Sequence, residues 1–143
     1  MLTEKDYCDY DTCVALRELG YKVPTSAYYM PHHKDLIWVS NPFRGGYVTD
    51  CFYSHNSLPK DVMTANFIDA PTLWEVQKWL REKRRIDANA FYDNMDASWR
   101  FYILEIDSPD LSGTHAYNDA YMSYEEALLE GVRESVKLLK EEK

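Results

Sequence analysis

The sequence predicts an α+β fold, in which an antiparallel or mixed sheet of about five strands carries three helices, at least two of them packed on one face. Three observations support this class. Several runs are rich in Tyr, Trp, Val and Ile and are separated by turn residues, as strands are. Three other segments repeat apolar residues at helical spacing. Two extended runs, joined by a short polar connection, predict an antiparallel hairpin. We expect the 143 residues, 45% of them hydrophobic, to form a single domain over 1–143.

The first half of the chain predicts one helix followed by strands. Within 9–19, Cys13, Leu16 and Leu19 lie at helical spacing, and Gly20 follows where a left-handed C-terminal cap would sit. Residues 25–53 contain three extended runs, TSAYYM, DLIWVS and GYVTDCFY, separated by turn chemistry. The stretch 54–69 has no clear period, and we interpret it as a loop with one short strand at 65–68.

A second helix is predicted over 72–85. Leu73, Val76 and Leu80 share one face of it. Pro71 suits the first turn, because a backbone N–H would be unpaired there anyway. We expect this helix to end near Arg85.

The runs ANAFYD (88–93) and SWRFYILEI (98–106) predict a β-hairpin around NMDA. In the second run, residues 99, 101 and 103 point to one side and residues 102, 104 and 106 to the other. A strand that is apolar on both faces is usually central, or its second face is covered by a partner. A weak edge strand is predicted at 114–117.

The last helix has the clearest sequence signals. Ser123 and Glu126 form a capping box pattern. An apolar stripe follows at helical spacing and is expected to face the core: Tyr124, Leu128, Val132, Val136 and Leu139. Acidic residues early and lysines late complement the helix dipole.

The net charge of −8 argues against binding to DNA, RNA or anionic lipid through the overall charge of the protein. One segment differs, because residues 71–86 hold five basic and two acidic side chains. On the second helix this places an aromatic residue and three cations along one stripe, which is the predicted binding surface: Trp74, Lys78, Arg81 and Arg85. The stripe could contact a nucleic-acid backbone or an acidic partner protein. Alternatively, Glu75, Glu82 and the acids of the last helix neutralise it as ordinary surface charge.

No pattern predicts a metal, a cofactor or a catalytic group. Cys8 and Cys13 are five residues apart and match no zinc spacing. Cys51 and His55, the nearest nucleophile–base pair in sequence, would stand about 13 Å apart on an extended strand. The odd number of cysteines favours reduced thiols in the cytoplasm, and no apolar stretch approaches the length of a membrane helix.

Two segments, APTLWEVQKWLREKRRI at 70–86 and YMSYEEALLEGVRESVKLL at 121–139, lie on either side of the aromatic hairpin. This arrangement resembles a group of small proteins encoded in bacterial prophages and integrative mobile elements. Their typical features are a Pro-Thr helix start, a Trp-Leu-Arg-Glu run and a Tyr-Glu-Glu-Ala helix start. The N-terminal ALRELGY followed by AYY is also similar. The resemblance implies no activity or ligand. It implies a cytoplasmic accessory protein of a mobile element.

These observations favour a small binding or regulatory module that acts through protein contacts. Its partner is unknown, and one form is a homodimer that covers the spare apolar face of strand 98–106. The alternative is a nucleic-acid-associated protein that uses the basic helix 72–85. An enzyme of unknown class is third.

Overall fold

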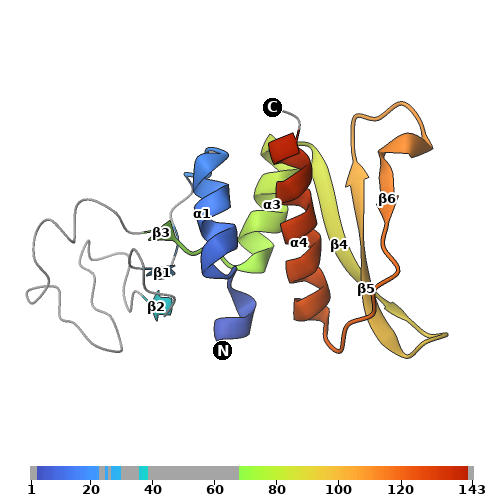
Figure 1. Ribbon diagram of the computed structural model, residues 1–143, viewed down its shortest axis with the longest axis horizontal. Coiled ribbons are helices and arrows are strands. Elements are labelled where there is room, and N and C mark those ends of the chain that lie inside the picture. The colour runs from blue at the N-terminus through green and yellow to red at the C-terminus, as the bar shows by residue number, and fades with distance from the viewer. Residues whose placement is uncertain (1–2, 23–24, 26, 30–35, 39–67, 142–143) are drawn as a thin grey trace, which may run out of the picture. The chain divides into compact units, whose positions relative to one another are not determined.

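The computed structural model describes residues 3–22, 25, 27–29, 36–38 and 68–141 (Figure 1). The chain forms two compact units. One, the N-terminal unit, contains residues 7–71, and the other, the hairpin unit, contains residues 1–6 and 72–143. The described residues include three α-helices and six strands. The α+β class is therefore confirmed.

The N-terminal unit consists of helix α1 (Tyr10–Glu18) and a sheet of three short strands. β1 (Ala27–Tyr29) is central and pairs antiparallel with β2 (Leu36–Trp38) and β3 (Ile68–Asp69). The helix ends as predicted, since Gly20 has a φ of +97° that suits glycine. The third strand expected within 46–53 lies outside the described residues.

The hairpin unit carries a three-stranded antiparallel sheet in the order β4-β5-β6. β4 (Ile86–Asp93) and β5 (Ser98–Glu105) form the predicted hairpin, and β6 (Thr114–Ala116) is the predicted edge strand. β5 is central, as the sequence indicated. Two 3₁₀ turns, η1 (Glu4–Asp6) and η4 (Leu111–Gly113), complete the unit together with α3 (Leu73–Lys83) and α4 (Tyr124–Glu141).

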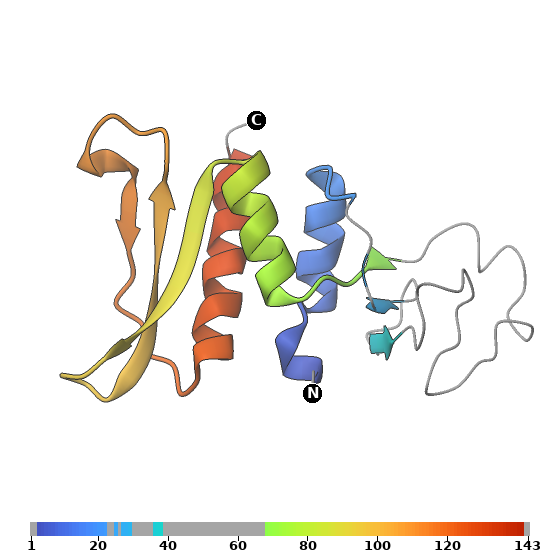
Figure 2. The ribbon, with the colours of Figure 1, turned by 180° about the vertical axis from the view of Figure 1, so that it is seen from behind.

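Helices α3 and α4 lie on the same face of the β4-β5-β6 sheet, as both ribbon views show (Figures 1 and 2). α4 presents its predicted stripe to the sheet, with Leu128 and Val132 fully buried. α4 packs against β5 at Gly131, where a Cβ would lie 3.4 Å from the ring of Phe101, an ordinary van der Waals contact. Gln77 of α3 donates a 2.8 Å hydrogen bond to the carbonyl oxygen of Ala88 and so covers part of the outer edge of β4.

The expected single sheet of about five strands is wrong, because the strands form two separate three-stranded sheets. The local patterns located most strands correctly. They did not determine which strands pair, because pairing depends on contacts between residues far apart in the sequence.

Pro71 does not lie in the first turn of α3, contrary to the prediction. The helix begins at Leu73, and Thr72 is its N-cap and forms a capping box with Glu75. The Thr72 hydroxyl accepts a 3.2 Å hydrogen bond from the Glu75 N–H, while the Glu75 carboxylate accepts one of 2.9 Å from the Thr72 N–H. The sequence T-x-x-E carried this signal.

Candidate binding surfaces

The structure places three of the four predicted site residues on one exposed stripe of α3. Trp74, Lys78 and Arg81 lie at i, i+4 and i+7, and all three are exposed. The opposite side of the helix is buried through Leu73, Val76 and Leu80, as its apolar spacing predicted. We call the three exposed residues the α3 stripe.

The two cations of the α3 stripe form no ion pair among the described residues. Several of the acids that were expected to neutralise them have other partners. Glu75 caps its own helix, while Glu130 and Glu134 of α4 bind Arg133 and Lys137 of α4. Glu82 is exposed on α3 and forms no ion pair with either cation within the described part of the chain. Lys78 and Arg81 therefore remain available to a ligand.

Arg85 does not belong to the α3 stripe, contrary to the prediction. α3 ends at Lys83 with Arg84 as its C-cap, and Arg85 has a left-handed backbone with φ of +57°. This conformation turns its side chain off the helical path and toward Asp107, whose carboxylate accepts hydrogen bonds of 3.1 to 3.3 Å from the guanidinium. The pairing lowers the pKa of Asp107 and raises that of Arg85.

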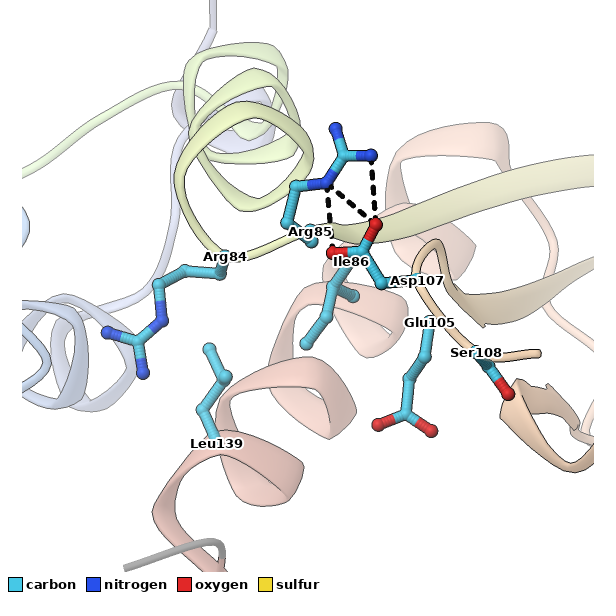
Figure 3. A pocket seen from close by; sticks show the side chains of 7 residues that line it. All are labelled: Arg84, Arg85, Ile86, Glu105, Asp107, Ser108 and Leu139. Atoms are coloured by element: carbon cyan, nitrogen blue, oxygen red, sulfur yellow. Dashed lines mark hydrogen bonds and ion pairs between the residues drawn. The ribbon is translucent and has the colours of Figure 1, made fainter.

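A shallow cleft of about 330 Å³ lies beside this ion pair (Figure 3). Most of its charged groups already have partners, since Arg85 holds Asp107, and Oε2 of Glu105 lies 3.1 Å from Nε2 of His115, which is outside the cleft lining. In Figure 3 the Arg84 side chain extends away from the two carboxylates, and its guanidinium stacks over the Trp79 ring. The cleft lining is Arg84, Arg85, Ile86, Glu105, Asp107, Ser108 and Leu139.

The face of the β4-β5-β6 sheet opposite α3 and α4 is a second candidate surface, which we call the outer face. Alternation along β5 buries Phe101 and Ile103 and leaves Leu104 36% exposed on the outer face. Phe91 of β4 is 42% exposed there and lies 6.1 Å from the Tyr102 ring, centroid to centroid. In the hairpin unit, the ribbon views show no described helix on this face (Figures 1 and 2).

The charges of the outer face are mostly balanced internally. Arg100 binds Asp93 at 2.9 Å and also contacts Asp96 and the carbonyl oxygen of Asn118. Asp87 is the remaining acidic residue on the paired outer-face positions of β4 and β5, and no ion pair to it is found among the described residues. The apolar centre of the outer face is therefore flanked by the Arg100–Asp93 pair and by one unpaired acid, Asp87.

The described thiols are buried in the N-terminal unit. Cys13 donates a 3.6 Å hydrogen bond to the backbone carbonyl of Cys8, and both cysteines are free. The contact with Cys8, together with burial, raises the pKa of the Cys13 thiol far above its usual range. Cys51 and His55 lie outside the described residues. Over the described ranges, no three His, Cys, Asp or Glu residues are grouped as metal ligands.

Comparisons of the chain with protein-family models, with curated proteins and with solved structures found no match. Among the described helices, none has the length and apolar character needed to cross a membrane. The surfaces are therefore interpreted from their own chemistry.

Proposed function

We propose that this chain is a small binding module that acts through protein contacts, and that the outer face is where it self-associates. The observation that carries this proposal is the exposure of Phe91 and Leu104 beside Tyr102 on a sheet whose other face carries α3 and α4. Exposed apolar groups gathered on one rigid surface are typical of interfaces. From the sequence patterns of 70–86 and 121–139 we also propose that the chain is a cytoplasmic accessory protein of a mobile element.

A second copy of the chain is the occupant that suits the charges. In an isologous dimer the same face meets itself, so unpaired like charges would oppose one another. Arg100 already neutralises Asp93 in each copy, which leaves Asp87 as the main source of repulsion. Four positions of β4, four of β5 and two of β6 form the face. These ten positions are a third to a half of the roughly 20–30 residues that each partner gives to a standard interface, so we expect micromolar affinity.

Sedimentation velocity over a micromolar concentration series tests the proposal. We expect a reversible dimer that is lost in Leu104→Glu, because a buried carboxylate without a partner is costly. Trp74→Glu is the matched control. The exposed fraction of Trp74, 40%, is similar to the 36% of Leu104, but Trp74 lies on α3 and not on the outer face. Higher salt should strengthen the dimer, because each copy carries a net charge of −8. A strict monomer at all concentrations, or equal dimerisation by both variants, would contradict the proposal.

Nucleic-acid binding by the α3 stripe is the second candidate. The observation that favours it is that exposed Lys78 and Arg81 accompany Trp74, which provides a surface for base stacking. Two free cations are few beside the 6–10 phosphate contacts of strong DNA binders, so we expect weak affinity with a shallow salt slope. The double change Lys78→Glu and Arg81→Glu should abolish binding of a single-stranded oligonucleotide. Arg85→Glu should alter it less, because Arg85 already holds Asp107. No measurable binding by the unmodified chain would refute this candidate.

A further inference from the structure

One end of the hairpin unit exposes an unusual amount of apolar side chain. Met95, in the turn between β4 and β5, is 93% exposed, and Met122, just before α4, is 92% exposed. Tyr92, the last aromatic residue of β4, is 47% exposed. We call these three residues together with Trp99 the aromatic–methionine end.

Trp99 gives this end a rigid base. Its backbone exchanges two hydrogen bonds with Tyr121, of 2.9 and 2.8 Å. Its ring makes edge-to-face contacts with Tyr92, at 5.3 Å between centroids, and with Tyr124, at 5.5 Å. These contacts hold the aromatic rings in place before any ligand arrives, which reduces the entropic cost of binding. The two flexible methionines can adapt to the shape of an apolar partner.

The surroundings of this end are strongly acidic. The turn segment 93–100 and the segment 117–130 contain six Asp and Glu residues and a single cation, Arg100. That cation is already bound to Asp93 and Asp96. The pKa of Tyr121 is raised first by burial and then by the carboxylates of Glu130, Asp119 and Glu134, whereas Arg133 lowers it. Asp119 and Glu126 are exposed at this end.

We propose that the aromatic–methionine end binds a basic amphipathic segment of a partner protein, with apolar side chains against Tyr92, Met95 and Met122 and cations against the surrounding acids. The combination of adaptable apolar contacts and acidic surroundings suits such a segment. A nucleic acid or an anionic membrane would be repelled by the acids. A second copy of this same end would bring like charges together. The inference does not depend on self-association through the outer face.

The probe for the test is a synthetic peptide of about 18 residues, built from Leu and Lys so that it forms an amphipathic helix. Two matched peptides separate the contributions, one with Glu in place of Lys and one with Ser in place of Leu. Isothermal titration calorimetry should show saturable 1:1 binding of the Leu–Lys peptide, with affinity that falls as salt rises. Neither matched peptide should bind comparably. Equal binding of the Leu–Glu peptide, or no binding of the Leu–Lys peptide, overturns the proposal.

Variants locate the binding surface. The combined change Tyr92→Ala, Met95→Ala and Met122→Ala should weaken Leu–Lys binding about tenfold or more, because it removes the exposed apolar contacts. Lys83→Ala, at an exposed position at the end of α3 outside all the proposed surfaces, is the control and should leave peptide affinity unchanged. An unchanged affinity in the triple variant, or an equal loss in Lys83→Ala, would overturn the assignment.

A charge variant gives an independent arm that leaves the aromatic packing intact. Asp119→Lys with Glu126→Gln should lower the affinity for the Leu–Lys peptide and reduce its salt dependence, whereas no effect would overturn the electrostatic part.

Sedimentation of the triple variant keeps the two proposals separate. The triple variant should dimerise like the unmodified chain, because its outer face is intact.

Discussion

Gly131→Ala should stabilise the hairpin unit, which makes it a sharp test of how α4 packs on β5. Gly131 lies inside α4 with its Cα facing the Phe101 side chain. A Cβ built there would lie 3.4 Å from Phe101 Cδ2 and 3.5 Å from both Phe101 Cβ and Cγ. These distances are ordinary van der Waals contacts. The new methyl group therefore fits without moving its neighbours.

Two favourable effects add in this substitution. Replacing Gly by Ala inside a helix gains about 0.5–1 kcal/mol, because the unfolded chain loses freedom. Burying the added methyl group against Phe101 contributes up to about 0.8 kcal/mol. We expect the free energy of unfolding to rise by about 1 kcal/mol, which corresponds to an increase of several degrees in Tm.

Urea unfolding followed by far-UV circular dichroism measures this effect, as a higher midpoint at an unchanged m value. Gly113→Ala is the matched control, since it makes the same chemical change in the same unit. Its Cβ would lie 2.3 Å from Ser108 Cβ, so it should destabilise by about 1–3 kcal/mol. A lower midpoint for Gly131→Ala would refute the reasoning, because it would mean that α4 and Phe101 have no room for a methyl group.

Three further outcomes are expected. Thr72→Ala should cost about 1 kcal/mol in urea unfolding, because the N–H of Glu75 loses its capping acceptor, and an unchanged midpoint would contradict that role. The pKa of Asp93 is lowered by the hydrogen bond from the Met95 N–H and by Arg100. The stability that the charged Asp93 carboxylate contributes to the fold is therefore complete above the unfolded-state pKa of about 3.9, and it is lost as the pH falls through the lower folded-state pKa. Carboxyl NMR should show Asp93 titrating below a model Asp, and titration at or above the model value would refute the hairpin-turn geometry. Cys13 should resist alkylation by iodoacetamide in native buffer, because its raised pKa and its burial leave almost no accessible thiolate. Mass spectrometry measures the alkylation rate, and a rate as fast as in denaturant would show that the Cys13 thiol is accessible to solvent.

The sequence alone determined the elements whose signals are local. The capping residue Ser123, the stripe that continues to Leu139 and the run 98–106 each predicted their element correctly, since helical and strand periodicity are properties of neighbouring residues. The alternation along β5 also predicted the spare apolar face. It placed Leu104 opposite Phe101 and Ile103 before any partner strand was known.

Only the tertiary structure decided which distant residues meet. Arg85 continues the helical spacing of Trp74, Lys78 and Arg81, yet Asp107, 22 positions further along the chain, binds it in a turn that the helix pattern could not reveal. The division of the strands into two sheets has the same cause. Local periodicity specifies which face of an element is apolar, whereas the residue that a side chain finally contacts depends on long-range packing.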